Sequence, residues 1–350
     1  MTELAPVKEF DITMQRVPHF TGSGRIGWHE RPILDPGPGE LLLRVRANAL
    51  CGSDRRQFES GTDITPGHEA AGEVAAIGRG TSTPVGTRGV VFLMDFCGAC
   101  RSCAIGATNL CSDRRADMGF TRDGGYGRFE LVHETNFFPV GPSVDLVTAT
   151  LLLDVMGTTS HALARAALVR PDIESILVAG AGPVGLGMVA MARLLLGPAV
   201  DIFVADVIPF RLDLGERLTA HAIDLRHANL AAAMADAGLS GGVDVAVDTS
   251  GREMARRALL DAVGRRGVLV CVGHGEGLTV TVSEDLIAPE RTVMGSEYFR
   301  YDALPGNLAL LERNGVFLEQ IVTHRLPIDQ LELAYGLFLG GDTGKVVVIQ

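Results

Sequence analysis

The middle of the chain alternates short, almost wholly apolar runs with longer amphipathic stretches. The apolar runs cover residues 176–179, 201–206, 243–251 and 267–275. Continuous apolar runs of this length are typical of strands that are buried on both faces of a parallel sheet. Because helical patterns lie between the runs, the sequence predicts an α/β fold with a doubly wound parallel sheet.

The flanks of this region carry a different pattern. Residues 34–40 read as a turn rich in proline and glycine, and a strand pattern follows over residues 41–50. Residues 320–350 predict a strand, a helix and a final strand. A chain of 350 residues exceeds what one hydrophobic core usually serves, so we expect two domains.

Composition narrows the classes of protein that remain. The formal net charge is −11 and aromatic residues make up 5% of the chain, which argues against a nucleic-acid-binding surface. The sequence has no uninterrupted run of 18 apolar residues that would predict a membrane span, and residues 1–10 lack the pattern of a secretory signal. We therefore expect a cytoplasmic protein whose six cysteines do not form disulfides and whose clustered cysteines bind metal, with Cys271 packed in the core.

Four of these cysteines are clustered. They are spaced Cys97-x2-Cys100-x2-Cys103-x7-Cys111. Such spacing lets four thiolates converge on one ion, and a four-thiolate set leaves no open coordination position, as in structural zinc sites. An iron–sulfur cluster is the alternative, because similar spacing occurs there. The cluster therefore predicts a structural staple rather than a reaction centre.

A glycine-rich turn follows the first central apolar run. It reads Gly180-x-Gly182-x-x-Gly185 and leads into a helical pattern. These glycines permit a tight turn, close approach of the backbone to a pyrophosphate, and close helix–strand packing. Asp206 ends the next run, 21 residues after Gly185, where a carboxylate accepts ribose hydroxyls and repels a 2′-phosphate. The motif predicts NAD rather than NADP, although Asp206 could be an ordinary helix cap and Arg211 could soften the discrimination.

A second set of ligand-type residues is spread over the first half of the chain. Cys51, His68 and Asp154 supply a thiol, an imidazole and a carboxylate. These are ligand types of catalytic zinc sites, which keep one position open for substrate or water. Taken singly, the histidine could be a core residue and the aspartate a helix cap.

In this order the motifs resemble the zinc-dependent medium-chain dehydrogenase family over nearly the whole chain. They are CGSD from residue 51, GHExxGxxxxxG from residue 67, and the four-cysteine lobe. The resemblance implies a mainly β GroES-like catalytic domain over residues 1–155 and 296–350, which carries the structural-zinc lobe. The NAD-binding Rossmann domain, residues 156–295, would be inserted between its two parts.

The resemblance also implies roles for individual residues. Cys51, His68 and Asp154 would hold a catalytic zinc, and Glu69 would be an alternating ligand or a neighbouring carboxylate. Ser53 matches the hydroxyl that passes the alcohol proton outward. Arg56 stands where many members have a histidine that ends this relay, and arginine cannot accept a proton. The residues implied at the dinucleotide are Thr158, Gly180, Gly182, Pro183, Val184, Gly185, Asp206, Arg211, Val272 and Gly273.

The segment YFRYD, residues 298–302, bears on the substrate. It resembles the Phe-Arg-Tyr run that lines the active site of sorbitol-type polyol dehydrogenases. This implies that Arg300 and Tyr301 contact a polyol or sugar alcohol, although both could instead make an interdomain contact. Asp154 departs from the glutamate of those enzymes, which leaves the metal geometry open.

Other readings stay open at this point. Simple secondary alcohols, threonine-like amino alcohols and cyclitols are alternative substrates. A catalytically degenerate NAD-binding protein and a zinc-free reductase are alternatives of another kind, which the retained ligands disfavour. The resemblance implies two zinc ions, NAD, a small-molecule alcohol substrate and a homodimer or homotetramer, with no nucleic-acid or membrane partner.

Overall fold

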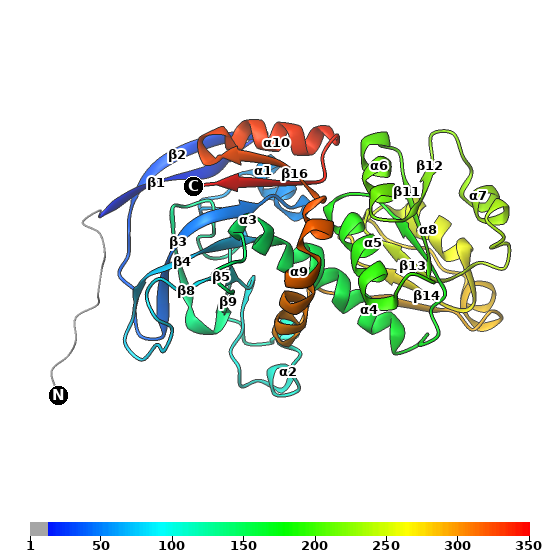
Figure 1. Cartoon of the computed structure of the whole chain (residues 1–350), viewed down its shortest axis with the longest axis horizontal. Coiled ribbons are helices and arrows are strands. Elements are labelled where there is room, and N and C mark those ends of the chain that lie inside the picture. Colours follow the sequence, from blue (N-terminus) through cyan, green and yellow to red (C-terminus); the bar gives the residue numbers. More distant parts are fainter. Residues whose placement is uncertain (1–12) are drawn as a thin grey trace.

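The computed structural model describes residues 13–350, which form two large sheets beside one another (Figure 1). The six-stranded sheet is parallel throughout, with the order β12-β11-β10-β13-β14-β15. The chain thus adds β11 and β12 on one side of β10, and then adds β13, β14 and β15 on the other side. Its strands are β10 (Ser175–Ala179), β11 (Asp201–Asp206), β12 (His221–Asp224), β13 (Val243–Asp248), β14 (Val263–Cys271) and β15 (Thr292–Gly295).

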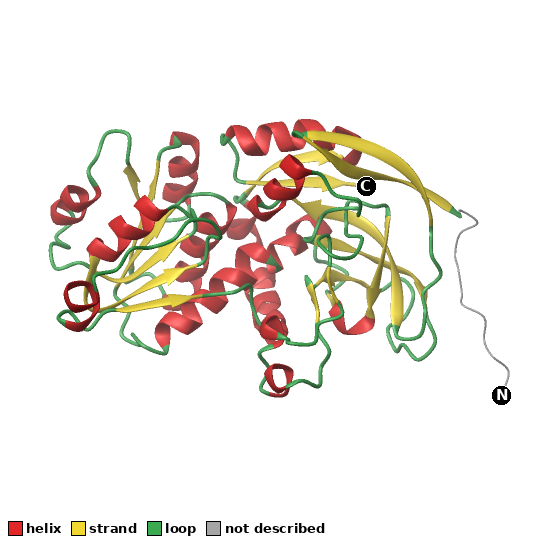
Figure 2. Cartoon of the chain, turned by 180° about the vertical axis from the view of Figure 1, so that it is seen from behind, coloured by secondary structure: helices red, strands yellow, loops and turns green. Residues whose placement is uncertain are grey.

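Helices cover both faces of this sheet (Figure 2). Its central strand β10 is buried at all five positions, and its side chains alternate between two cores. Ile176 and Val178 belong to one core, whereas Leu177 and Ala179 belong to the other. This double burial explains why the sequence shows a continuous apolar run here. The accompanying helices are α4 (Thr159–Ala167), α5 (Pro183–Leu196), α6 (Pro209–Arg217), α7 (Leu230–Asp236) and α8 (Glu253–Ala262).

The seven-stranded sheet is built from both ends of the chain. Its order is β16-β17-β3-β4-β5-β9, and β8 also pairs with β3. The C-terminal strand β17 runs antiparallel to β3, with Val347 opposite Ala49. The strands are β3 (Glu40–Ala49), β4 (Ala70–Ile77), β5 (Arg88–Val91), β8 (Phe129–His133), β9 (Phe137–Pro139), β16 (Val322–Pro327) and β17 (Lys345–Ile349).

Smaller elements complete this part of the molecule. A hairpin and a two-residue pair form two further sheets. They are β1 (Met14–Gly22) with β2 (Arg25–Pro32), and β6 (Met94–Asp95) with β7 (Ala116–Asp117). The helices are α1 (Arg55–Ser60), α2 (Arg101–Ala104), α3 (Leu146–Ala149), α9 (Leu304–Glu319) and α10 (Leu331–Gly340).

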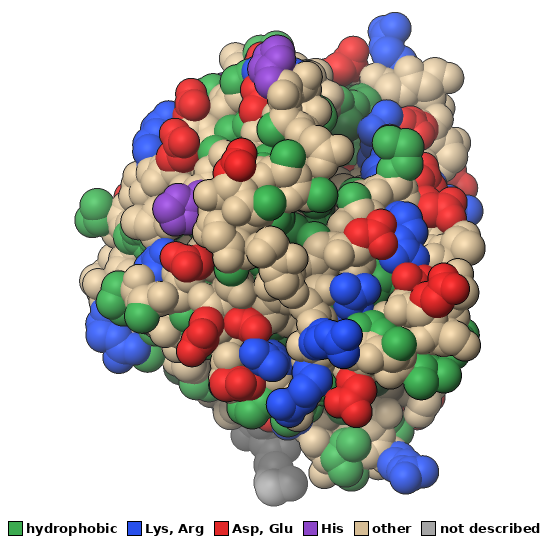
Figure 3. Space-filling view, turned by 90° about the vertical axis from the view of Figure 1, so that its right-hand side faces the viewer, with side chains coloured by type: hydrophobic (Ala, Val, Ile, Leu, Met, Phe, Trp, Pro, Cys, Tyr) green, Lys and Arg blue, Asp and Glu red, His purple; other side chains and the backbone are tan. Residues whose placement is uncertain are grey.

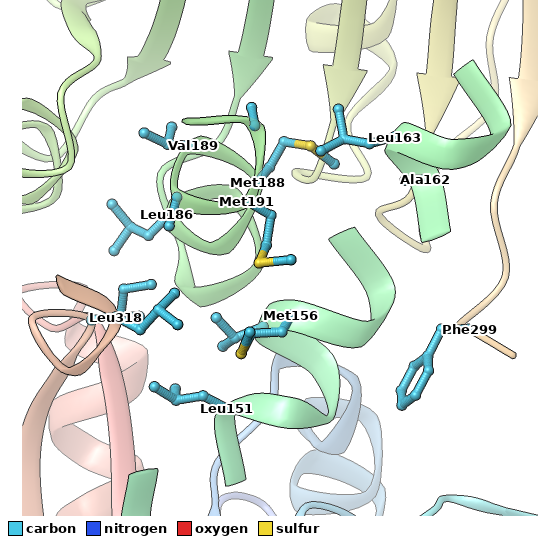
Figure 4. Packing of buried hydrophobic residues seen from close by; sticks show 14 of the residues in the cluster. Leu151, Met156, Ala162, Leu163, Leu186, Met188, Val189, Met191, Phe299 and Leu318 are labelled. Carbon is cyan, nitrogen blue, oxygen red and sulfur yellow. The ribbon is translucent and has the colours of Figure 1, made fainter. Parts of the chain in front are cut away.

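One hydrophobic core joins the two large parts. Leu186, Met188 and Met191 of α5 face Met156 and Leu163 of the segment that leads into and through α4 (Figure 4). By length and composition alone, Leu146–Ala167 could cross a membrane, but 89% of its apolar window is buried inside the protein. It is therefore a core element of this fold.

The surface at the end of the six-stranded sheet carries both charge signs. Acidic and basic side chains are interspersed on the face in Figure 3, with hydrophobic atoms between them. This fits a chain whose 42 acidic residues only moderately outnumber its 31 basic ones.

Candidate metal and dinucleotide site

Strand pairing brings Cys51, His68 and Glu69 together. Cys51 follows β3, and His68 and Glu69 precede β4. These two strands are antiparallel neighbours, with Asn48 opposite Ala70, so the three residues meet at the same end of the sheet. The backbone bond from Ala49 N–H to Glu69 C=O, 3.1 Å long, fixes this junction.

Asp154 reaches the same place from another element. It opens a buried π-helical turn, Asp154–Thr158, just before α4. Its Oδ2 lies 2.9 Å from Cys51 Sγ and 3.6 Å from His68 Nε2. One ligand atom from each of Cys51, His68, Glu69 and Asp154 lies within 4.8 Å of the others.

A buried hydrogen bond at Nδ1, on the side of the ring away from the ligand cluster, orients His68. Its Nδ1 lies 2.9 Å from Asp54 Oδ1, which leaves Nε2 facing the ligand cluster. The other Asp54 oxygen accepts hydrogen bonds from the Tyr335 hydroxyl at 3.0 Å and the Tyr126 hydroxyl at 3.5 Å. The two tyrosine hydroxyls lie 3.0 Å apart, and all three side chains are buried. A carboxylate behind a ligating histidine fixes its tautomer and ring orientation.

Glu69 forms a fully buried ion pair with Lys345 of β17. Lys345 Nζ bonds to Oε1, while Oε2 has no hydrogen-bond partner among residues 13–350. Burial, followed by the Asp154 carboxylate, raises the pKa of Cys51 to about 11. Lys345 thus leaves one buried carboxylate oxygen of Glu69 unsatisfied beside the Cys51 thiol, the His68 imidazole and the Asp154 carboxylate, as expected where a further cation binds. The residues therefore fit a zinc ion, whose charge would favour loss of the thiol proton.

The four-cysteine lobe has the geometry of a metal site rather than of disulfides. Cys97 Sγ lies 4.0 Å from Cys103 Sγ, and Cys100 Sγ lies 3.8 Å from Cys111 Sγ. A disulfide needs about 2.05 Å, whereas a zinc tetrahedron with bonds of about 2.3 Å separates its sulfurs by about 3.8 Å. Amide hydrogens of Ala99 and Cys100 point at Cys97 Sγ and lower its pKa. The lobe therefore fits a closed four-thiolate zinc site.

The glycine turn between β10 and α5 leaves room for a ligand. Gly180 has φ +94°, and a side chain on Gly185 would collide with Gly180 O. By contrast, an added Cβ on Gly182 would meet one described atom within 4 Å, Arg211 Nη1 at 3.8 Å. The turn is thus tightly packed at Gly180 and Gly185 and open at Gly182. A pyrophosphate would approach at this open side, in front of α5, which begins with Pro183 and Val184.

Asp206 and Arg211, two further residues implied at the dinucleotide, lie beside this turn. Asp206 ends β11 and accepts hydrogen bonds from the backbone N–H groups of Ala181 at 2.5 Å and Ile208 at 2.9 Å. Arg211 Nε donates to Thr343 O at 3.0 Å, so this arginine joins the turn to the segment before β17. Thr158 is buried at the end of the π-helical turn, and Val272 and Gly273 follow β14.

Arg300 and Tyr301 already have intramolecular partners. The Tyr301 hydroxyl donates to Phe137 O at 2.7 Å, and its backbone N–H donates to Thr108 Oγ1 at 2.9 Å. Arg300 Nη2 donates to Asp302 Oδ2 at 2.6 Å. These contacts connect the segment after β15 with β9 and the cysteine lobe.

Sequence reasoning missed a different tyrosine in the same segment. Tyr298 is buried, has φ +41°, and its hydroxyl accepts a bond from Leu93 N–H at 3.4 Å. Burial first, then Asp154, Glu69 and Cys51, raise the pKa of this phenol well above its usual range. Tyr298, not Tyr301, is therefore the tyrosine whose pKa is raised by the charges of the ligand cluster.

Comparison with known proteins agrees with this arrangement. Two family descriptions match the chain: "Alcohol dehydrogenase GroES-like domain" over residues 37–142 and "Zinc-binding dehydrogenase" over residues 183–313. The L-threonine 3-dehydrogenase of Rhizobium etli is 31% identical, over 92% of this chain and 94% of its own length.

Solved structures share the whole fold. A zinc-binding dehydrogenase from Sinorhizobium meliloti bound to NADP is 25% identical, with a TM-score of 0.85 and coverage of 97% of this chain and 100% of its own. The 2R,3R-butanediol dehydrogenase of Bacillus subtilis, 24% identical, also has a TM-score of 0.85 and covers 96% and 99%. The chain belongs to the zinc-dependent medium-chain dehydrogenase family, and it is an alcohol dehydrogenase-type enzyme whose cofactors are zinc and a nicotinamide dinucleotide.

Proposed function

We propose that the enzyme oxidises a secondary alcohol that carries further polar groups, with a polyol or sugar alcohol as the first candidate and NAD as the preferred cofactor. One observation carries the chemistry: Cys51, His68, Glu69 and Asp154 converge within 4.8 Å while one carboxylate oxygen stays unpartnered in the described chain. Zinc, when bound, supplies a Lewis acid and NAD supplies the hydride acceptor.

The chain's own residues would orient the alcohol and move its proton. Ser53 Oγ lies 3.3 Å from Cys51 Sγ and 3.4 Å from His68 Nε2, close enough to accept a proton from an alcohol held there. Ser53 is exposed to solvent, so its proton can pass directly to water. A histidine at the position of Arg56 would then be unnecessary. Asp54 would hold the His68 ring while the alcohol binds.

NAD preference is proposed from the position of Asp206. Its carboxylate stands at the end of β11 beside the glycine turn, where a 2′-phosphate would meet a like charge. Arg211 lies close to the same turn, and its positive charge would weaken the discrimination against a 2′-phosphate. The solved relative with bound NADP makes this preference worth measuring directly.

A second candidate substrate is a threonine-like amino alcohol. It is favoured by the curated relatives, of which several at 30–31% identity are named L-threonine 3-dehydrogenase. Polyol and amino alcohol share a reacting secondary hydroxyl with polar neighbours, so the same centre would serve either.

The deciding experiment is reduction of NAD, with NADP beside it, across sorbitol-type polyols, L-threonine and 2-butanol. Turnover concentrated on one polyol or on L-threonine would support the proposal and choose between the candidates. Turnover that favours 2-butanol would remove the requirement for further polar groups. Absence of turnover in protein with both zinc sites loaded would contradict the proposal.

We also propose a homodimer or homotetramer in a cytoplasmic setting. The support is the family resemblance, together with the outer edge of β15, which ends the six-stranded sheet without a further strand in the described chain. Light scattering of the purified protein would give the oligomeric state.

A further inference from the structure

A cavity of about 290 Å³ lies where β14 and β15 end. It is bounded by these two strands, by α4 and by the cysteine lobe. Ligands of open parallel sheets bind beyond the carboxyl ends of the strands, so the position is that of a binding site. Its lining includes Asn109, His161, Arg165, His274, Ser296 and Glu297.

Two buried side chains in this lining each have one polar atom without a hydrogen-bond partner in the described chain. Asn109 is 3% exposed and Ser296 is 8% exposed. Asn109 Nδ2 donates to Glu297 O at 2.7 Å, but within the described residues neither Asn109 Oδ1 nor Ser296 Oγ makes a hydrogen bond. Buried polar groups are nearly always satisfied, so these two atoms are places where a ligand's hydrogen bonds are expected.

Charged side chains also line this cavity. Glu297 Oε2 lies 3.4 Å from His274 Nε2, and both side chains are exposed, His274 by 80% and Glu297 by 45%. Arg165 Nε donates to Gly295 O at 3.0 Å, and His161 lies one helical turn before it on α4. The cavity therefore offers a carboxylate, an amide oxygen and a hydroxyl as acceptors, and a guanidinium as a donor.

One short segment links the lining of the cavity to the elements that hold the ligand cluster. Val272 and Gly273, which line it, are residues implied beside the nicotinamide. Ser296 and Glu297 also line it, and the ring of Phe299, two residues further on, packs against Gly157 in the turn that Asp154 opens. A substrate held at the ligand cluster can thus extend along residues 296–298 into the cavity.

We infer that this cavity binds the remaining polar groups of the alcohol substrate, and that Ser296 and Glu297 select substrates with hydroxyl or ammonium groups next to the reacting carbon. This inference rests on the proposed function. An alcohol without such groups would leave the buried Asn109 Oδ1 and Ser296 Oγ unpaired and would offer nothing to Glu297, which disfavours its binding. Hydroxyl and ammonium groups share the donor chemistry, and they differ in charge toward Glu297.

Equilibrium binding separates these possibilities. Sorbitol, L-threonine and 2-butanol are titrated by calorimetry into zinc-loaded enzyme saturated with NADH, for wild type, Ser296→Ala and Glu297→Gln. Glu284→Gln, an exposed acid outside the cavity lining, is the matched charge control. Removing an unpartnered hydroxyl should not impair folding, so Ser296→Ala remains informative if Glu297→Gln is unstable.

We expect Ser296→Ala to weaken binding of the polar alcohols about threefold and to leave 2-butanol unchanged. We expect Glu297→Gln to weaken L-threonine about tenfold or more, because its ammonium group would lose a charge-assisted bond, and sorbitol only about threefold. Glu284→Gln should behave as wild type. The ratio of the two losses tells which donor group the cavity prefers.

Several results would overturn the inference. These are unchanged affinities in both cavity variants, failure of wild type to bind either polar alcohol, or binding that requires NADH to leave. Turnover of a polar alcohol with unchanged variants would retain the proposed function and remove the cavity assignment. Cavity-dependent binding without turnover would retain the assignment and remove the proposed function.

Discussion

Replacing Glu130 with glutamine should change how stability depends on pH. Glu130 lies in β8 opposite Leu43 of β3 and is 1% exposed. Neither carboxylate oxygen has a hydrogen-bond partner in the part of the chain that the structure describes. Burial raises the pKa of Glu130 to about 8, and the nearby Arg122 only partly offsets this effect. The folded protein therefore holds this carboxyl protonated at neutral pH.

The sign of the effect follows from the proton balance. An unfolded glutamate has a pKa of 4.5, so between pH 4.5 and 8 the folded chain binds one proton that the unfolded chain does not. The free energy of unfolding then falls by about 1.4 kcal/mol for each pH unit, on the order of 5 kcal/mol over the interval. This contribution is fully present below pH 4.5 and is lost as the pH rises through 8.

Glutamine fits the same space but cannot titrate. We expect Glu130→Gln to unfold with a shallower pH dependence between pH 5 and 8, and to be more stable than wild type by a few kcal/mol near pH 8. Urea unfolding of the zinc-loaded protein at four pH values measures this difference, because the other titrating groups are shared. Glu216→Gln, which changes an exposed glutamate, is the control. Parallel pH profiles for wild type and Glu130→Gln would refute the reasoning.

Three further changes test the two metal sites and the dinucleotide site. Asp206→Ala should shift cofactor preference toward NADP, measured as the ratio of kcat/KM for the two cofactors; an unchanged ratio would remove its role. Cys111→Ser should lower the metal content by one zinc ion and the unfolding temperature by several degrees, whereas catalysis in the folded protein should change less. Retention of both ions would contradict a structural zinc site in the cysteine lobe. Tyr335→Phe removes the 3.0 Å bond to Asp54 and should let a chelator extract the catalytic zinc about tenfold faster, whereas an equal rate would contradict the support of His68.

Much of the fold was predictable because burial leaves a clear pattern. The strands β10, β11, β13 and β14 occupy the central apolar runs, as expected for a sheet covered on both faces. The short strand β12, His221–Asp224, was not predicted, since its alternating polar residues reflect its place at the sheet edge. The π-helical turn at Asp154 is set by tertiary packing and has no local signature.

The candidate site was likewise only partly predictable from the sequence. Cys51, His68 and Glu69 could be named from short motifs, and they lie beside the ends of β3 and β4. Asp154 could be named only from its position in the family resemblance. Lys345 and Tyr335 could not, since their contacts with Glu69 and Asp54 depend on the pairing of β17 and the packing of α10 against the first half of the chain. A lysine that begins an otherwise apolar strand was the one available signal.

The central claim is that the Cys51 cluster binds a catalytic zinc and the cysteine lobe a structural one. The most direct test is to count zinc by mass spectrometry in wild type, Cys51→Ser and Cys111→Ser, and to assay alcohol-dependent NAD reduction in the same samples. We predict two ions in wild type, and one ion with no turnover in folded Cys51→Ser. Two ions and undiminished turnover in Cys51→Ser would contradict the account.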